Sequence, residues 1–431
     1  MAEHWQNWGR SVETHPQRIA HPASTAEVSA LVREAAAAGI KIKAVGASHS
    51  FTAIAATDGI LLRLDRMNKI ISHDSVTARV RVQAGISLHE LNPRLNAMGL
   101  ALPNLGDVDP QSVAGAVSTG THGTGDKLFG ISKTVVGVQL VTGDGEVLEI
   151  DESHAWFGAS RVTLGALGIL TEVTLQCVPA FLLHAREEPM ALPEVLEGID
   201  QLVGDNDHFE FYWFPHTEKT MIKRNNRVPE GTEREPIGRF KHWLDDEFLS
   251  NTAFNGINRV VARQRSWIPK VNNLAASMLS AREYIDYSYN VFVSPRSVRF
   301  RESEFAMPRE ALGDVLGELK KWFDAGHERI SFPIEVRFTA ADDVWMSTGH
   351  ERDNVYVAVH QYVRSDYTDY FAAAQDIFTS YEGRPHWGKI HTLDSSYFAQ
   401  RYAKFNEFVE IRDRLDPQRT FSNEYLDRIL G

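Results

Sequence analysis

Residues 45–51 read VGASHSF, a run of small side chains around a single imidazole, His49. The run directly follows residues 40–45, IKIKAV, whose alternation of apolar and polar side chains predicts a β-strand. On its own the run is typical of a turn, in which a lone histidine is usually solvated. A binding role for His49 therefore depends on what the rest of the chain contributes.

The segments around this loop predict alternating helices and strands. Ser24 begins the capping-box pattern STAE, which starts a helix, and Gly39 stands where a left-handed residue ends one. A second capped helix is expected to begin at Ser87 and to end at Gly99, after two or three strand-like runs within residues 61–85. The loop that holds His49 is thus expected to leave a strand, where ligand sites of mixed α/β folds are commonly built.

The composition changes abruptly at residues 103–125, which read PNLGDVDPQSVAGAVSTGTHGTG. Glycine and small polar residues let main-chain N–H groups approach a ligand closely, as a phosphate-bearing cofactor requires. A flexible linker is the alternative, although linkers tend to lack the interleaved apolar residues found here. Residues 120–125, GTHGTG, have the wrong spacing for a dinucleotide fingerprint, and no Walker loop is present. The two small-residue stretches are therefore candidate cradle elements for a large phosphate-containing ligand.

Length, charge and cysteine content limit the class of protein. A chain of 431 residues exceeds the size at which single cores stop growing, so two domains are expected. A net charge of −12 argues against nucleic acid and anionic membrane surfaces as partners. Cys177 is the single cysteine and no metal-binding histidine motif occurs, so no metal site is expected. No apolar run approaches about 18 residues and no signal-peptide core is present, so a cytoplasmic location is expected.

Five stretches, in order along the chain, resemble those of the vanillyl-alcohol-oxidase family of FAD enzymes, in its sugar-lactone oxidoreductase and alditol oxidase branch. Residues 45–51 resemble the family's pyrophosphate loop, residues 112–125 its second flavin-contacting stretch, and residues 164–170, LGALGIL, the segment at the adenine side. Residues 332–345, FPIEVRFTAADDVW, are similar to the substrate-side Glu-x-Arg motif. Residues 384–389, RPHWGK, are similar to the C-terminal His-Trp-x-Lys signature.

The resemblance implies an α+β, two-domain FAD-binding fold of the vanillyl-alcohol-oxidase type. An FAD-binding domain is expected over residues 1–178, completed by the C-terminal segment 386–431. An α/β cap domain that binds the substrate is expected over residues 179–385.

The resemblance also implies FAD bound covalently through His49, with the imidazole joined to the methyl group at position 8 of the isoalloxazine. A neutral imidazole is a competent nucleophile for such a bond at physiological pH. The expected cofactor-binding residues are Val45, Gly46, Ala47, Ser48, His49, Ser50, Phe51, Ser112, Gly115, Thr119, Gly120, Thr121, His122, Gly168, Ile169, His386 and Lys389.

Glu335 and Arg337 alternate in sequence and so face the same way from a strand, which by itself would indicate a surface ion pair. The resemblance implies instead that both are catalytic together with Lys389. Glu335 would accept hydrogen bonds from substrate hydroxyls, Arg337 would stabilise charge on the reacting oxygen, and Lys389 would lie near the pyrimidine end of the flavin. The general base stays open between Glu335, Lys389 and a water.

Two further residues are expected to bind the substrate alongside Glu335, Arg337 and Lys389. His360 is expected to contact the substrate, and His386 is expected to contact the cofactor. The alternative for each is a histidine that only packs in the core. Asp107 departs from the small residue that the resemblance leads us to expect at its position, which puts the fine shape of the substrate pocket in doubt.

The reaction implied is hydride transfer to FAD from a sugar 1,4-lactone of the L-gulono-, L-galactono- or D-arabinono type. Residues 101–115 and 411–430 resemble the lactone enzymes more closely than the alditol oxidases, which act on polyols such as xylitol or sorbitol. Gly106 stands at a position that controls oxygen access in this family and predicts an oxidase that forms hydrogen peroxide. A dehydrogenase with another electron acceptor, an alditol oxidase and a flavin-binding protein without turnover are the alternatives.

Overall fold

The structure is a computed structural model that describes residues 3–238, 254–261, 263–294 and 298–431. Helices and strands are mixed throughout, which confirms the expected α+β class. In the described residues, no helix is long and apolar enough to cross a membrane. The elements predicted before His49 are also found in the chain: a capped helix, a strand and then the loop.

A parallel sheet and a larger antiparallel sheet in the N-terminal half of the chain contribute to one apolar core. Ser24 caps the first helix by accepting a hydrogen bond from the Glu27 N–H, and Gly39 ends that helix at a φ of 65°. The parallel sheet has the order β3 (Arg18–Ala20), β5 (Ile60–Arg63), β4 (Ile42–Val45). The antiparallel sheet has the order β10 (Val147–Asp151), β9 (Val135–Val141), β11 (Ile169–Gln176), β7 (Arg79–Gln83), β6 (Ile70–Asp74). The helices are α1 (Thr25–Ala38), α2 (Leu88–Ala97), α3 (Val113–Ser118) and α4 (Phe157–Ser160).

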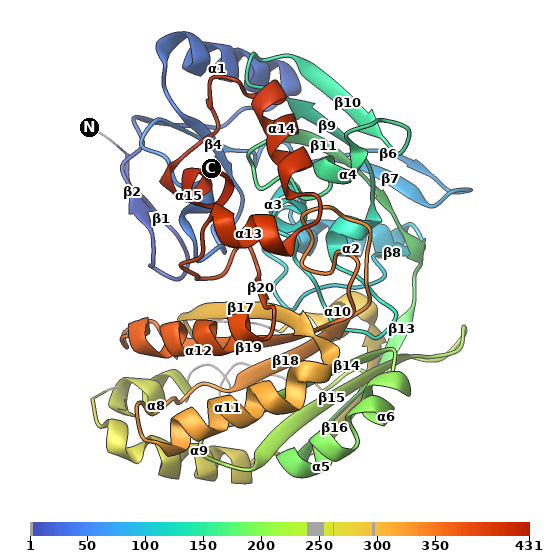
Figure 1. The fold of residues 1–431 in the computed structure, drawn as a ribbon. Helices are drawn as coiled ribbons and strands as arrows, with labels where there is room; N and C mark the ends of the chain where they lie inside the picture. Colours follow the sequence, from blue (N-terminus) through green and yellow to red (C-terminus); the bar gives the residue numbers. More distant parts are fainter. Residues whose placement is uncertain (1–2, 239–253, 262, 295–297) are drawn as a thin grey trace.

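An antiparallel sheet of eight strands forms the second part of the molecule. Alternate residues of β18 divide between its faces: Ile334, Val336 and Phe338 join an apolar core with the helices, whereas Glu335 and Arg337 point to the other face. Figure 1 shows α11 on one side of this sheet and the N-terminal half of the chain on the other. The strand order is β16 (Arg282–Tyr287), β13 (Leu182–Ala191), β15 (Lys219–Arg227), β14 (His208–Trp213), β18 (Ile334–Thr339), β19 (Asn354–Tyr362), β17 (Phe300–Pro308), β20 (Arg384–Pro385).

The helices of this second part lie between its strands in the sequence and pack beside the sheet. The two longest, α11 and α12, contribute buried apolar residues to the same core as the sheet. The helices described in this part are α5 (Leu192–Glu197), α6 (Ile199–Gly204), α8 (Phe254–Val261), α9 (Ile268–Ser277), α10 (Ser288–Phe292), α11 (Leu312–Asp324) and α12 (Thr368–Ser380).

The C-terminal segment returns to the N-terminal half. Its helices are α13 (Ser395–Arg401), α14 (Phe405–Leu415) and α15 (Glu424–Leu430). The backbone N–H of Ile42 donates to the Thr420 carbonyl oxygen over 3.0 Å, and the Lys43 ammonium donates to the Phe421 carbonyl oxygen over 2.9 Å. These contacts support the proposal that residues 386–431 complete the domain of residues 1–178, with residues 179–385 as the cap.

Short strands near the N-terminus were not predicted from the sequence. β1 (Trp5–Gln6) pairs with β2 (Glu13–Thr14) in a two-stranded sheet. The segment between them covers the loop that holds His49. The Asn7 amide donates to the Ser50 carbonyl oxygen over 2.9 Å, and the Ser11 hydroxyl donates to the Phe51 carbonyl oxygen over 2.7 Å.

Candidate active site

Two adjoining cavities define the candidate site. The larger one, of about 430 Å³, lies within the N-terminal half, and the smaller one, of about 90 Å³, is lined by both halves of the chain. Four residues line both cavities: His49, Ser50, Gln111 and Thr119. A ligand that fills the larger cavity can therefore reach the smaller one past His49.

Most of the predicted cofactor residues line one or both cavities. Gly120 lines neither of them and instead follows the end of α3 at a φ of 73°. The larger cavity is lined by Val45, Gly46, Ala47, Ser48, His49, Ser50, Ser112, Gly115, Thr119, Gly168 and Ile169. The smaller cavity is lined by His49, Ser50, Phe51, Thr119, Thr121, His122, His386 and Lys389.

The larger cavity fits FAD because its walls bring main chain, rather than bulky side chains, to the ligand. A Cβ atom at Gly46 would collide with the Ser112 hydroxyl, so the first small-residue loop passes directly against the second. A Cβ atom at Gly168, whose φ is 154°, would lie 2.6 Å from the Val141 carbonyl oxygen. Close approach of backbone N–H groups is what a pyrophosphate requires when cationic side chains do not provide the contacts.

The N-terminal segment holds the His49 loop in an unusual backbone conformation. Ser48 has a φ of 62°, in the left-handed region that few residues other than glycine adopt. The Trp5 indole N–H donates to the Ser48 hydroxyl over 3.0 Å, and the Trp8 backbone N–H donates to the Ser48 carbonyl oxygen over 2.8 Å. The Trp8 ring stacks on His49 with 5.4 Å between centroids. Burial, and then the Lys389 charge, lower the pKa of His49, which favours its neutral imidazole.

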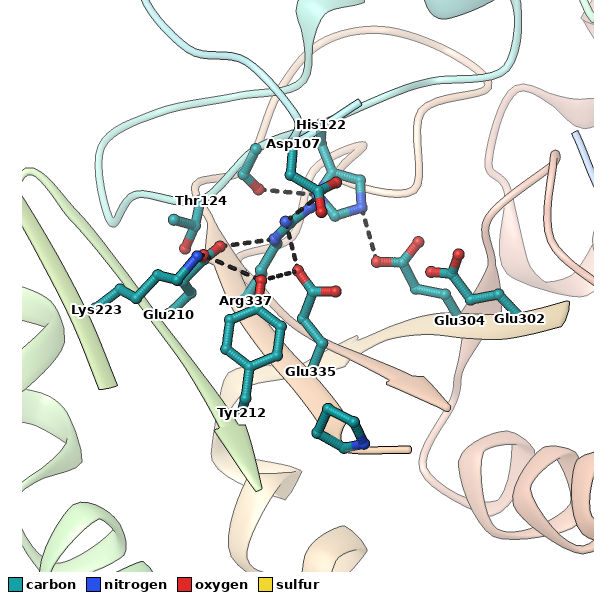
Figure 2. Close-up of polar contacts among 12 residues, drawn as sticks. Asp107, His122, Thr124, Glu210, Tyr212, Lys223, Glu302, Glu304, Glu335 and Arg337 are labelled. Carbon is teal, nitrogen blue, oxygen red and sulfur yellow. Dashed lines mark hydrogen bonds and ion pairs between the residues drawn. The ribbon is translucent and has the colours of Figure 1, made fainter. Parts of the chain in front are cut away.

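Arg337 lies in the middle of a buried group of carboxylates in the smaller cavity. It pairs with Glu335, lies 2.9 Å from Glu210 and 3.5 Å from Asp107 (Figure 2). Burial alone would lower the pKa of Arg337, but these carboxylates outweigh it and raise that pKa well above its ordinary value. Glu335 and Arg337 are only 6% and 8% exposed, so the alternative of a surface ion pair is wrong.

Sequence analysis missed the residues behind this pair. The Tyr212 hydroxyl lies 3.1 Å from Glu335 and 3.2 Å from Glu210, and the Lys223 ammonium lies 3.3 Å from Glu210 (Figure 2). These side chains come from β14 and β15, whose sequences carry no motif of the family resemblance. Polar residues at alternate positions of a strand were the only sequence pattern that could have identified them.

Two more carboxylates that sequence analysis missed, Glu302 and Glu304 of β17, hold Lys389. The Lys389 ammonium pairs with Glu302 and lies 4.0 Å from Glu304. Burial opposes the charge of Lys389, but the two carboxylates outweigh it and raise the Lys389 pKa. Burial likewise opposes the charge of Glu302, yet Lys389 and then His360 lower the pKa of Glu302 to about 2. The lysine is thus held as an ammonium in this cavity.

Three histidines complete the smaller cavity. The His122 Nε2 atom lies 3.2 Å from Glu304, whose pKa is lowered because His122 and then Lys389 outweigh the effect of burial. His386 accepts a hydrogen bond at Nδ1 from the Gly388 N–H over 3.0 Å, and burial lowers its pKa to about 3. The His360 Nε2 atom lies 3.6 Å from Glu302 and 3.9 Å from Glu335.

The oxygen-access candidate, Gly106, also lines the smaller cavity, next to Asp107. A Cβ atom built on Gly106 would lie 3.1 Å from the His122 carbonyl oxygen and 3.4 Å from the Thr121 methyl group. All the residues predicted for catalysis, substrate binding and oxygen access therefore line this one cavity, namely Gly106, Asp107, Glu335, Arg337, His360 and Lys389.

Comparison with known proteins identifies the family to which the chain belongs. Residues 173–429 match the model of the D-arabinono-1,4-lactone oxidase family, and residues 16–151 match that of the FAD binding domain. The chain belongs to the D-arabinono-1,4-lactone oxidase family. Membership confirms the family resemblance drawn from the sequence and the prediction of an FAD-dependent oxidoreductase that acts on CH–OH groups.

Other members of this group are similar over their whole length. The chain is 40% identical to L-gulono-1,4-lactone dehydrogenase of Mycobacterium tuberculosis over 100% of both chains. It is 35% identical to L-gulonolactone oxidase of Mus musculus over 99% of this chain and 98% of the relative. It is 30% identical to alditol oxidase of a Streptomyces species over 98% of both.

A solved structure supports the fold alone. The crystal structure of cholesterol oxidase from B. sterolicum superimposes with a TM-score of 0.82 at 18% sequence identity, covering 100% of this chain and 97% of that one. This similarity confirms the two-domain FAD-binding fold predicted for this member of the D-arabinono-1,4-lactone oxidase family.

Proposed function

We propose that the protein oxidises a sugar 1,4-lactone of the L-gulono-, L-galactono- or D-arabinono type at one carbinol carbon. The observation that carries this proposal is the smaller cavity, where Glu335, Arg337 and Lys389 meet beside His49. The names of the full-length relatives support the lactone as substrate. When bound, FAD accepts the hydride that leaves this carbon.

The side chains of the smaller cavity suit a neutral substrate with several hydroxyl groups. Arg337 donates to the reacting oxygen and stabilises negative charge that develops there. Glu335 accepts hydrogen bonds from neighbouring hydroxyls, and Asp107 and Glu302 add acceptors to the same walls. Because buried carboxylates already face both Arg337 and Lys389, an anionic ring-opened acid would meet repulsion that the neutral lactone avoids.

An anaerobic substrate screen tests this function. The holoenzyme is mixed with each of the three lactones, with the matching ring-opened acids, and with xylitol and sorbitol, and flavin absorbance is followed. We expect a lactone to bleach the flavin fastest and the acids to be poor substrates. Faster bleaching by a polyol would favour the alditol oxidase alternative, and no bleaching by any compound would favour a flavin-binding protein without turnover.

We propose further that FAD is bonded covalently to His49. The lowered pKa of His49 supports this, since it keeps a nitrogen lone pair available near neutral pH, and Trp8 holds the ring in one orientation. Acid precipitation of the holoenzyme should leave a yellow, fluorescent protein band under denaturing conditions. A colourless pellet from the intact protein would contradict the proposal, and His49→Ala should release the colour into the supernatant.

We also propose that molecular oxygen reoxidises the flavin and forms hydrogen peroxide. Gly106 supports this because it lacks a Cβ atom at the wall of the smaller cavity. The alternative is a dehydrogenase, the activity for which the relative from Mycobacterium tuberculosis is named. Substrate-reduced enzyme should reoxidise rapidly in air with stoichiometric peroxide, and Gly106→Ala should slow that step while sparing flavin reduction. Slow reoxidation of the unmodified enzyme, with fast turnover on a dye or cytochrome, would establish the dehydrogenase.

A further inference from the structure

We propose that His360 is the general base of the reaction, which accepts the proton of the reacting hydroxyl at its Nε2 atom. The inference rests on the proposed function and concerns the one role that sequence analysis left open. It is carried by the hydrogen-bond partners of each ionisable side chain that lines the smaller cavity.

The two cations of the cavity carry their protons too firmly to act as bases. Lys389 is held as an ammonium by Glu302 and Glu304. Arg337 is held as a guanidinium by three carboxylates and is not deprotonated in proteins. Lys389, which was one of the candidates from the sequence, is therefore better suited to orient the substrate than to accept its proton.

The carboxylates are engaged by these cations, and the Asp107 Oδ1 atom lies 3.5 Å from Arg337. The Glu335 Oε1 atom pairs with Arg337 and lies 3.1 Å from the Tyr212 hydroxyl, so a proton that arrived at this atom would weaken both contacts. Glu302 and Glu304 have lowered pKa values because they face Lys389 and histidines, which makes them weak bases.

Two other histidines have both ring nitrogens committed. The His122 Nδ1 atom lies 2.9 Å from the Gly123 carbonyl oxygen, and its Nε2 atom lies 3.2 Å from Glu304. The His386 Nδ1 atom accepts from the Gly388 N–H, so in the neutral ring Nε2 carries the proton. His49 is assigned to the flavin bond.

The ring nitrogens of His360 are arranged as a general base requires. Its Nδ1 atom lies 3.0 Å from the Pro333 carbonyl oxygen, which can only accept, so Nδ1 carries the proton and Nε2 holds the lone pair. The Nε2 atom is 3.6 Å from Glu302 and 3.9 Å from Glu335, too far for a short hydrogen bond to either, and Glu302 is its nearer partner when the ring carries a charge. A substrate hydroxyl can therefore bind at Nε2.

The surroundings of the ring stabilise the charge that proton transfer creates. The charged groups that face the ring are Glu302 of β17 and Glu335 of β18, with Lys389 and Arg337 behind them. The Phe300 ring meets the imidazole edge-on at 5.0 Å between centroids and limits its rotation. Both carboxylates lie on the side of the ring that carries Nε2, where the proton arrives.

The proposed step balances in atoms and charge. The O–H bond of the carbinol breaks and its proton forms an N–H bond at Nε2 of His360. The oxygen's electron pair forms the new carbonyl bond as the hydrogen on the same carbon leaves with its own electron pair for the bound FAD. The products are the ketone form of the lactone, an imidazolium and a flavin reduced by two electrons.

The test is His360→Gln in the holoenzyme, because glutamine keeps a donor and an acceptor near the same place but cannot act as a base at neutral pH. Anaerobic stopped-flow measurements should give a rate of flavin reduction by the lactone about 100-fold or more below that of the unmodified enzyme. The substrate dissociation constant, the flavin spectrum and reduction by dithionite should change little. The unmodified enzyme should lose reduction rate as pH falls, and the variant should lack this limb of the profile.

Two further variants keep the proposal falsifiable. His360→Ala should recover part of its reduction rate when imidazole is added, because a free base can enter the space that the ring leaves. Glu335→Gln should weaken substrate binding but retain the pH limb. A pH limb that is lost in Glu335→Gln and kept in His360→Gln would assign the base to Glu335 and overturn the proposal.

Failure of this inference can be told apart from failure of the proposed function. If no lactone reduces the unmodified enzyme, the proposed function is wrong. If a lactone reduces the unmodified enzyme and His360→Gln at the same rate, the function stands and the assignment of His360 is wrong.

Discussion

The two cavities of the active site share His49 but are built in different ways. The larger one is formed mainly by loops of small residues that bring main chain to the ligand, as at Gly46 and Gly168. The smaller one is formed largely by charged side chains from strands, with carboxylates facing Arg337 and Lys389. Backbone shape defines the cofactor cavity, whereas a balance of buried charges defines the substrate cavity.

This difference predicts that the two cavities respond differently to mutation. Changes in the cofactor cavity should act through steric fit and thus through flavin content. Changes in the substrate cavity should act through charge, and thus through reaction rate and stability together, because each buried charge is balanced by several others.

The largest effect is expected for Arg337→Ala. Turnover should fall about 100-fold or more, as when one charge-stabilising donor is lost. Thermal stability should fall as well, because the change leaves Glu335, Glu210 and Asp107 without their shared cation in a buried place. Stopped-flow reduction and thermal unfolding of the same preparation measure the two effects.

Arg282→Ala is the matched control. Arg282 donates from Nε to Glu187 over 2.7 Å in another largely buried pair of the same sheet, but it lines neither cavity of the active site. It should lose stability and keep its rate of flavin reduction. Equal losses of rate in both variants would mean that Arg337 acts through folding alone.

The contrast also explains which parts could be predicted from the sequence. The helix from Ser24 to Gly39 has its cap, its apolar spacing and its left-handed end within one short segment, and the structure confirms it. The small-residue loops around His49 and Ser112 are likewise contiguous, so their composition was visible before any fold was known. That both loops face the same cofactor could still be expected only through the family resemblance.

The substrate cavity could be predicted only in part, since its side chains meet through sheet order. Glu302 and Glu304 alternate along β17, which predicts only that they share one face of a strand. They line the same cavity as Glu335 because β19 lies between β17 and β18, an order that does not follow the sequence. Glu210 reaches Arg337 from β14 for the same reason.

A smaller effect, on flavin content, is expected for Gly168→Ala. The new Cβ atom would meet the Val141 carbonyl oxygen at 2.6 Å, and the φ of 154° disfavours any side chain. The cost is about 1–3 kcal/mol of backbone strain, which should lower the fraction of protein that carries flavin. The ratio of flavin to protein absorbance measures this fraction.

Gly313→Ala provides the comparison for this variant. Gly313 lies within α11, where a Cβ atom would meet nothing within 4 Å. Because Gly313 is the second residue of this helix, the change should alter stability little and leave flavin content unchanged. Normal flavin content in Gly168→Ala would show that the cofactor cavity tolerates a shift of its backbone.

The smallest effect is expected for Lys43, a buried cation in the wall of the cofactor cavity. Its ammonium donates to the carbonyl oxygens of Gly165 and Phe421, each over 2.9 Å. Burial lowers the pKa of Lys43 to about 7, although Asp416 and Asp427 act in the opposite direction. The lysine thus links the C-terminal segment to the wall of the cofactor cavity. Its lowered pKa means that it exchanges its proton near pH 7.

The sign of the pH effect follows from this lowered pKa. Between about pH 7 and 10.5 the unfolded chain binds the Lys43 proton and the folded chain does not, so stability rises with pH across this window. Burial raises the pKa of Cys177 to about 12, which lowers stability above about pH 9. That contribution is common to the unmodified protein and to Lys43→Met, so it cancels in their difference. The melting temperature of the unmodified protein minus that of Lys43→Met should therefore increase by a few degrees from pH 7 to 10. A constant difference would mean that Lys43 keeps its ordinary pKa and that the wall of the cofactor cavity holds a full charge.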